Sequence, residues 1–260
     1  MSEPAFRYAI VRPPAPNLGD GLTTADLGSP DPALALAQHE AYCAALEHCG
    51  LTLTRLPADP RHPDSTFVED TAILARGRAI VTRPGAASRQ GEVASTRETL
   101  AGFYDGVESI EAPGTLDGGD VCEAEDHVLI GISERTNVEG ARQLAAFFAS
   151  VGLTSDTIDI RGIPEILHLK SGLAHVGHGR MVAIRELASH PALGRYQVLT
   201  VHDDEVYAAN CIVVNGRILV PAHHPRTLAA LEHLGTEMIP LDMTEFRKMD
   251  GGLSCLSLRF

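Results

Sequence analysis

Apolar and polar residues along the chain form two patterns: short runs that alternate every second residue, and longer stretches with apolar residues three and four apart. The first pattern is typical of strands and the second of helices. The longer stretches predict helices over residues 32–49, 91–104, 137–151 and 225–234, with a short helix after Arg185. The shorter runs predict strands near residues 51–56, 71–75, 79–82, 107–111, 121–124, 128–131, 157–160, 197–201 and 237–241.

The first helix has the clearest boundary signals. Asp31 precedes it as an N-cap, Pro32 occupies its first turn, and Gly50 follows its end. Its predicted apolar stripe consists of Leu36, Cys43 and Leu46.

Hairpins, helices and strands recur in the same order along the chain. Short turns at Gly77-Arg78, Gly179-Arg180 and Asn215-Gly216 join pairs of strands. The fourth copy is degenerate, and the fifth has a single strand left at the C-terminus, so residues 8–11 are predicted to complete its pair. The repeat predicts an α/β fold of about five ββαβ units, closed into a ring by pairing of the first strand with the last.

Residues that could take part in catalysis or binding occupy the same place in these units, just before or at the start of the hairpin. They are found in the segments 64–70, 116–120, 167–170 and 251–255. A pseudo-symmetric ring would direct all of these segments toward one axis. The alternative is that loops collect glycine and aspartate for conformational reasons alone.

Cys255 is the candidate nucleophile. If residues 255–260 form an alternating strand, Leu256, Leu258 and Phe260 share one face and the thiol of Cys255 lies on the other, polar face. A reactive thiol needs a base or a positive charge nearby, and His168 is the candidate. The alternatives are that Cys255 is a small buried residue and that His168 is a packing residue.

The other histidines are weaker candidates for catalysis or metal binding. His223-His224, and His175 with His178, are predicted to be surface or packing residues. No three-residue set has recognisable zinc spacing.

Three carboxylates, Asp64, Glu69 and Asp70, surround Phe67 at the entrance of a strand. They could form a solvated acidic turn. Alternatively, carboxylates that lose water together gain from a cation, and a planar guanidinium pairs with them through bidentate hydrogen bonds. A substrate that is also an amino acid needs arginines for its own carboxylate, and two candidates follow hairpins: Arg89 and Arg135.

Composition narrows the class of protein. The 260-residue chain is 44% hydrophobic and has a formal net charge of −13 without a block of basic residues, which argues against nucleic acid as a partner. The negative charge either favours approach of a cationic small molecule or serves solubility alone. The five cysteines lack CxxC spacing, and no signal peptide or membrane span is recognised, so a cytoplasmic protein with reduced thiols is expected.

Segments in order along nearly the whole chain resemble the dimethylarginine dimethylaminohydrolases, guanidine-modifying enzymes of the pentein superfamily. The matching segments are Asp-Gly-Leu-Thr at 20–23, Asp-Ser-Thr-Phe-Val-Glu-Asp at 64–70, Thr-Arg-Pro-Gly-Ala at 82–86, Ile-Glu-Ala-Pro-Gly-Thr at 110–115, Arg-Thr-Asn at 135–137, Leu-His-Leu-Lys at 167–170, Tyr-Ala-Ala-Asn-Cys-Ile at 207–212 and Arg-Lys-Met-Asp-Gly-Gly-Leu-Ser-Cys-Leu-Ser-Leu-Arg-Phe at 247–260. The resemblance implies a pentein five-bladed ββαβ propeller and a single catalytic domain over residues 1–260.

The resemblance also implies a reaction and roles for single residues. The reaction is hydrolysis of Nω-methylated arginine to citrulline and a methylamine through a covalent thiouronium intermediate. Cys255 would attack the guanidinium carbon, His168 would transfer protons, and Asp117 would orient the histidine, at a position where some relatives carry glutamate. The substrate-binding residues would be Leu22, Asp64, Phe67, Glu69, Asp70, Arg89, Arg135 and Met249, with Leu22 in a flexible lid and Leu22 and Met249 acting through their carbonyls.

No metal or other cofactor is implied, with Zn²⁺ expected only as an inhibitor, and a homodimer is expected by analogy. Two rival functions remain open. An arginine deiminase would share the nucleophile, histidine and carboxylates but release ammonia from unmethylated arginine, and its family carries an extra helical insertion for which this chain leaves little room. A non-catalytic pentein-fold binding protein would need neither Cys255 nor His168.

Overall fold

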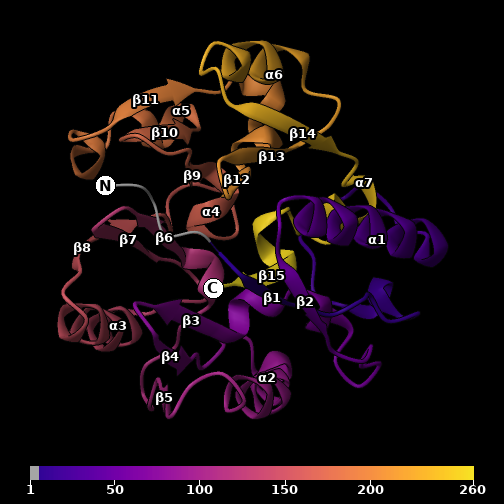
Figure 1. The fold of residues 1–260 in the computed structure, drawn as a ribbon, viewed down its shortest axis with the longest axis vertical. Coiled ribbons are helices and arrows are strands. Elements are labelled where there is room, and N and C mark those ends of the chain that lie inside the picture. The colour runs from indigo at the N-terminus through magenta and orange to yellow at the C-terminus, as the bar shows by residue number, and fades with distance from the viewer. Residues whose placement is uncertain (1–5) are drawn as a thin grey trace.

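Residues 6–260 form a ring of five small sheets (Figure 1). The computed structural model describes these residues. Residues 1–5 lie outside the described residues, and so does this part of the segment for which no signal peptide is predicted. Each sheet has three strands. Two of them form an antiparallel pair, and a third returns parallel to the middle strand after a helical segment. The five-fold ββαβ repeat predicted from the sequence is confirmed.

Four units follow one another along the chain. Their strands are β3 (Ala72–Ala75), β4 (Arg78–Val81) and β5 (Val107–Ser109); β6 (Val121–Ala124), β7 (His127–Ile132) and β8 (Thr154–Asp159); β9 (Leu173–His175), β10 (Arg180–Ala183) and β11 (Gln197–Thr200); and β12 (Ile212–Val214), β13 (Arg217–Pro221) and β14 (Glu237–Leu241). Their helices are α2 (Val93–Leu100), α3 (Val138–Ser150), α5 (Arg185–Ala188) and α6 (Pro225–Glu232). The short helices α4 (Leu169–Gly172) and α7 (Thr244–Arg247) lie between units.

The fifth unit joins the two ends of the described chain. It consists of β15 (Ser257–Arg259), β1 (Tyr8–Val11), α1 (Pro32–His48) and β2 (Thr52–Arg55). β1 pairs antiparallel with β15, placing Ile10 opposite Leu258, and parallel with β2. The prediction that residues 8–11 complete the last unit is therefore confirmed.

A short helical turn precedes the first strand of every unit. We call these the axial turns: residues 63–71, 118–120, 169–172, 203–209 and 254–256. The turn at 68–71 packs against those at 118–120 and 254–256, and α4 packs against the turns at 118–120 and 203–209. Larger helices such as α2, α3 and α6 lie at the outside of the ring, whereas α4 lies near its centre (Figure 1). The repeat thus brings the predicted chemical segments together.

Helix α1 shows where local sequence signals succeed and fail. Asp31 caps it as predicted, since its Oδ1 accepts hydrogen bonds from the backbone N–H groups of residues 33 and 34 at 2.8 and 3.0 Å. Leu36, however, is 45% exposed, so its assignment to the buried stripe is wrong. The other two residues of the predicted stripe, Cys43 and Leu46, are buried as predicted. The buried face also includes Ala35 and His39, which are too small or too polar for an apolar pattern to detect.

The C-terminal strand begins later than predicted. Cys255 and Leu256 lie in the axial turn 254–256, and only Ser257–Arg259 pair with β1. The prediction that Cys255 is part of an alternating strand is therefore wrong. The physical reason is a turn closed by the Cys255 N–H, which donates to the Gly252 carbonyl at 3.2 Å. Among the described residues, no helix combines the length and apolar composition of a membrane span.

Candidate active site

The turn that carries Cys255 is fixed by Asn210. The Asn210 amide accepts from the Ser254 N–H at 3.0 Å and donates to the Ser254 hydroxyl at 3.0 Å and to the Lys170 carbonyl at 2.8 Å. A Cβ at Gly252 would lie 2.4 Å from the Asn210 side chain, so the close approach requires glycine here. Asn210 therefore connects the turn that carries Cys255 to the segment that carries His168.

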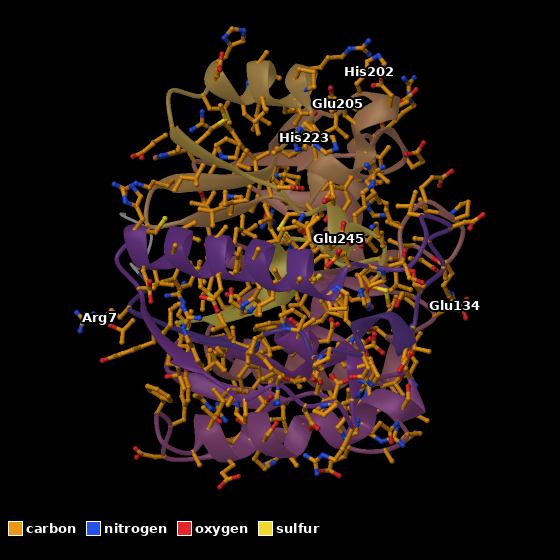
Figure 2. The ribbon with its side chains drawn as sticks, turned by 90° about the vertical axis from the view of Figure 1, so that its right-hand side faces the viewer. Arg7, Glu134, His202, Glu205, His223 and Glu245 are labelled. Atoms are coloured by element: carbon orange, nitrogen blue, oxygen red, sulfur yellow. The ribbon has the colours of Figure 1, made fainter. Side chains whose placement is uncertain are left out.

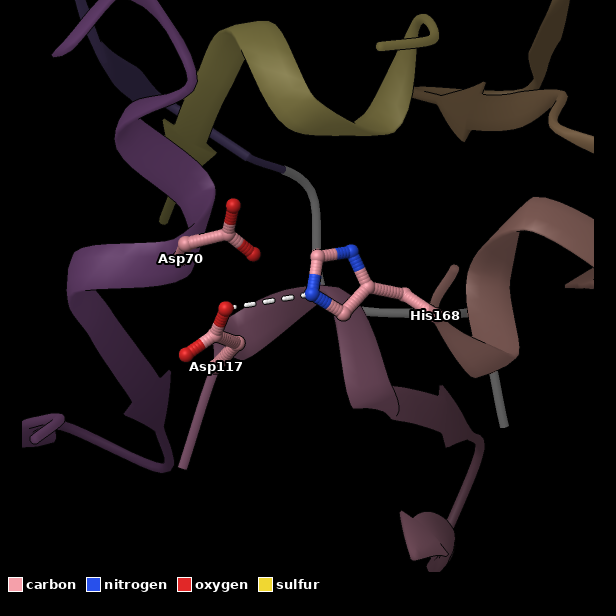
Figure 3. Close-up of side chains that lie close together, drawn as sticks. All are labelled: Asp70, Asp117 and His168. Carbon is pink, nitrogen blue, oxygen red and sulfur yellow. Dashed lines mark hydrogen bonds and ion pairs between the residues drawn. The ribbon is translucent and has the colours of Figure 1, made fainter. Parts of the chain in front are cut away.

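His168 is oriented by a buried carboxylate. Its Nε2 lies 3.1 Å from Oδ2 of Asp117, and Figure 3 shows Asp117 and Asp70 on the same side of the imidazole. Asp117 is fully buried, and its Oδ1 accepts the Gly85 N–H at 2.9 Å. With both oxygens engaged, the carboxylate holds the ring in one orientation and leaves Nδ1 on the opposite side of the imidazole.

Asp70 and Arg89 form a buried ion pair with a Nη1–Oδ2 distance of 2.6 Å. The other nitrogens of Arg89 donate to the carboxylate of Glu92 and to the carbonyls of Asp64 and Phe67. Most of its donors are thus used within the protein. Sequence reasoning missed Glu92, although its i, i+3 spacing from Arg89 is a recognisable ion-pair signal.

A lid loop, residues 19–24, covers the pocket and is held by two carboxylates. The Leu22 N–H lies 3.1 Å from both oxygens of Asp64. Oδ2 of Asp250 accepts from the Thr24 N–H at 2.6 Å, and the Thr23 hydroxyl donates to the Lys248 carbonyl at 2.9 Å. Asp250, a left-handed residue with φ of 55°, is a second residue that sequence reasoning missed, since no local pattern links it to a loop more than 200 positions earlier.

These side chains surround one small pocket. It is lined by Leu22, Asp64, Phe67, Asp70, Arg89, Arg135, Leu167, His168, Met249, Asp250, Gly251 and Cys255. Its free volume is only about 20 Å³, too little for an amino acid with the lid in this position. The lid loop must therefore open for a ligand of that size to enter.

Asp117 and Glu69 do not line this pocket. Asp117 lies behind His168, consistent with an orienting position. Glu69, predicted beside Asp70 at the guanidinium, instead directs its carboxylate into a second cavity, where it lies 2.6 Å from Lys170 and 3.4 Å from Arg259. Consecutive residues of a tight turn point in different directions, so Glu69 and Asp70 face opposite sides of the turn 68–71.

The environment sets the protonation of the site. Burial raises the pKa of the Cys255 thiol, and the nearby carboxylates of Glu69 and Asp70 raise it further, to about 12. Burial would lower the pKa of His168, but the carboxylates of Asp70, Asp117 and Asp120 raise it to about 9. At neutral pH the free protein therefore holds a neutral thiol and an imidazolium.

This protonation state predicts slow alkylation of Cys255 at neutral pH. The rate with iodoacetamide should rise about tenfold per pH unit between pH 6 and pH 9, because only the thiolate reacts. The measurement is mass spectrometry of the Cys255 peptide after timed quenching, with a Cys255→Ser variant to account for the other cysteines. A rate that reaches a plateau below pH 7 would contradict the raised pKa.

Side chains that can ligate a metal ion gather around His168. Within residues 6–260, the set with three such side chains close together is Asp70, Asp117 and His168, and the two carboxylates already bind Arg89, Gly119 and Gly85. His223 is exposed near α6 (Figure 2), and His224 is buried with Nδ1 2.6 Å from the Ala222 carbonyl, as predicted for surface and packing residues.

The chain is similar to curated proteins over its full length. A protein of Pseudomonas aeruginosa named dimethylarginine dimethylaminohydrolase is 47% identical, over 98% of this chain and 100% of the relative. A Streptomyces coelicolor protein with the same name is 38% identical, over 97% and 96% of the two chains. A scan against models of protein families found no match.

Solved structures agree with this similarity. The Pseudomonas aeruginosa enzyme, as a cysteine-to-serine variant complexed with citrulline, superposes with a TM-score of 0.95 at 46% identity, over 98% of this chain and 100% of that one. The N-terminal domain of ArgZ, a cyanobacterial arginine dihydrolase, has a TM-score of 0.88 at 15% identity, which shows a shared fold. Sequence similarity, fold and coverage together show that this chain belongs to the dimethylarginine dimethylaminohydrolase family.

Proposed function

We propose that this protein hydrolyses Nω-methylated L-arginine to L-citrulline and dimethylamine or methylamine. The observation that carries the proposal is the convergence of Cys255, His168 and two guanidinium-compatible carboxylates, Asp64 and Asp70, on one pocket. Relatives add support: one solved structure holds citrulline, and another is an adduct of a histidine variant with S-methyl-L-thiocitrulline.

Substrate binding activates the nucleophile. Asp64 and Asp70 pair with the guanidinium nitrogens, and Asp64 gives up its hydrogen bond to the lid to do so. A cation in the pocket offsets the negative field that keeps Cys255 protonated, so the thiol loses its proton to solvent. The thiolate then attacks the central guanidinium carbon and forms a C–S bond.

His168 moves the remaining protons. As an imidazolium it protonates the departing nitrogen, the C–N bond breaks, and neutral dimethylamine leaves a thiouronium cation on Cys255. The neutral imidazole then takes a proton from a water molecule that adds to the same carbon. The added hydroxyl group gives up its proton to solvent as the C–S bond breaks, which releases citrulline and restores the thiolate. Asp117 keeps the imidazole oriented through both proton transfers.

The amino-acid end of the substrate meets the rim of the pocket. Arg135 is proposed to bind the substrate carboxylate, whereas Arg89, with most donors already engaged, contributes charge and holds Asp70. The carbonyls of Leu22 and Met249 are proposed to accept the α-ammonium. Phe67, packed edge-on against Phe246 with ring centroids 6.3 Å apart, shapes the pocket wall.

Four further statements stay predictions from the sequence. Residues 1–260 are proposed to act as one catalytic domain, because the pocket takes residues from widely separated segments of the chain. Zn²⁺ is proposed to inhibit through Cys255 and His168, a thiolate and imidazole pair that zinc favours. A homodimer and a cytoplasmic location are expected from the resemblance and from composition.

The test is citrulline release from asymmetric dimethylarginine and, separately, from arginine. The proposal predicts citrulline from the methylated substrate and little from arginine. Citrulline from arginine alone would favour a deiminase, and none from either would favour a binding protein.

The lid contacts yield a prediction for Asp250→Asn. Asparagine tolerates the left-handed backbone but removes the charge that holds Thr24. Hydrogen bonds to charged groups contribute about 1.5–3 kcal/mol, so KM for methylarginine should rise roughly 10- to 100-fold with kcat changed less. Steady-state kinetics test this, with Asp242→Asn as the matched control, because Asp242 is exposed and its carboxylate accepts from the Thr244 N–H rather than from the lid loop. An unchanged KM would contradict the role of Asp250 in lid closure.

A further inference from the structure

A second cavity, which we call the axial cavity, lies along the centre of the ring. The first strand of every unit contributes to its lining, namely β3, β6, β9, β12 and β15, and these strands lie nearest the centre of the ring (Figure 1). It holds about 250 Å³. Since one water needs about 10–15 Å³ of such space, the cavity has room for a small organic molecule.

One layer of axial turns separates this cavity from the substrate pocket. In the turn 68–71, Asp70 faces the pocket and Glu69 faces the axial cavity. In the turn 254–256, Cys255 faces the pocket and Ser254 faces the cavity. These two turns pack against each other. The axial cavity therefore reaches the back of the nucleophile's turn.

The inner end of the cavity carries an incompletely satisfied carboxylate. Oε1 of Glu69 forms ion pairs with Lys170 at 2.6 Å and with Arg259 at 3.4 Å. Oε2 is buried and has no hydrogen-bond partner within residues 6–260, in a residue that is 4% exposed. A buried acceptor without a partner costs free energy, so a donor that enters the cavity gains an interaction already prepared for it.

A second carboxyl group and the apolar walls determine which class of ligand fits the axial cavity. Glu123 of β6 lines the cavity and is exposed there. Desolvation raises its pKa to about 7, although the nearby cations Lys170 and Arg259 act in the opposite direction. Much of the remaining lining is apolar: Ala72, Ile73, Leu74, Val121, Ala174, Ile212, Val213 and Leu258. The cations Lys170 and Arg259 also line the cavity, but both lie against Oε1 of Glu69. Oε2 of Glu69 and the Glu123 carboxyl group, among aliphatic side chains, therefore suit a cation that combines N–H donors with methyl groups.

We propose that the axial cavity binds a small methylated ammonium ion, with dimethylammonium as its first ligand. The identification of this ion as the reaction product rests on the proposed function. The argument that the cavity binds such a cation does not depend on that function. The amine is released at the carbon attached to Cys255, while the rest of the substrate fills the pocket and the lid loop covers its mouth. Once protonated by water, the amine is the cation that the cavity walls favour.

The experiment uses the full protein and dimethylammonium chloride as the probe. Saturation-transfer NMR reports binding on the methyl signals, with and without saturating citrulline. The proposal predicts transfer that persists with citrulline present. It also predicts an apparent Kd at least about tenfold weaker in Glu123→Gln, which removes the charge, and in Ala174→Leu, which fills the space. Glu232→Gln, an exposed charge change on α6, should leave the Kd unchanged.

Three results would overturn the proposal: no transfer, transfer abolished by citrulline, or an unchanged Kd in both cavity variants. Circular dichroism of each variant checks that it is folded. Failure of the proposed function would be seen separately, as absence of citrulline from methylarginine, because the binding experiment involves no turnover.

Discussion

Replacing Cys255 with serine should reduce citrulline formation by about 10⁴-fold or more while leaving ligand binding in place. A serine hydroxyl is a far weaker nucleophile than a thiolate, and a guanidinium carbon resists attack because its charge is delocalised. The side chain is 8% exposed, and the turn around it is held by Asn210 through Ser254, so the substitution should not disturb the backbone. Calorimetry with citrulline measures binding, and a sensitive citrulline assay measures turnover.

Cys49→Ser is the matched control for this variant. Cys49 is also buried but follows helix α1, outside both the substrate pocket and the axial cavity. Its turnover should stay near that of the unchanged protein. Turnover within tenfold of normal in Cys255→Ser would contradict nucleophilic catalysis by this residue.

Replacing His168 with glutamine should lower kcat by about 10²–10⁴-fold, the usual contribution of a positioned proton-transfer group. Glutamine retains hydrogen-bonding ability near Asp117 but neither protonates the leaving amine nor deprotonates water. Because His168 is proposed to donate a proton in the first step and to accept one in the second, the loss should fall on both formation and hydrolysis of the thiouronium. Stopped-flow and steady-state kinetics with dimethylarginine separate the two steps.

A pH profile of kcat/KM distinguishes a proton-transfer role of His168 from a purely structural role. The pKa of His168 is raised to about 9, so the limb of kcat/KM near that pH should disappear in His168→Gln. His223→Gln, an exposed histidine near α6, should keep both rate and profile. A His168→Gln variant that kept the normal profile with a lower rate would indicate a structural role only.

The repeat and the segments that carry Asp70, His168 and Cys255 could be predicted because their signals are local, whereas Leu22 and Met249 were implied only by the family resemblance. Asn215-Gly216 makes a tight hairpin turn and Asp31 caps a helix whatever the rest of the chain does. Given the repeat, pseudo-symmetry alone predicts that the turns of Asp70, His168 and Cys255 lie around one axis, and no information on their contacts is needed.

The features of the site that the sequence did not reveal depend on contacts across the ring. Glu69 and Asp70 are neighbours in sequence, yet packing of their turn against residues 254–256 sends their carboxylates into different cavities. Asp250 holds a loop more than 200 residues earlier in the chain. Arg89 looks free in sequence, but its donors are used by Asp70 and Glu92. Apart from the i, i+3 spacing of Arg89 and Glu92, these relations have no spacing that a sequence pattern can detect.

The most direct test of the account is the intact mass of the protein quenched in acid during turnover of dimethylarginine. We predict a fraction of molecules heavier by the mass of dimethylarginine less that of dimethylamine, with the added mass on the peptide that contains Cys255 and absent from Cys255→Ser. Citrulline release without such an adduct at any quench time, or an adduct on another residue, would contradict covalent catalysis by Cys255.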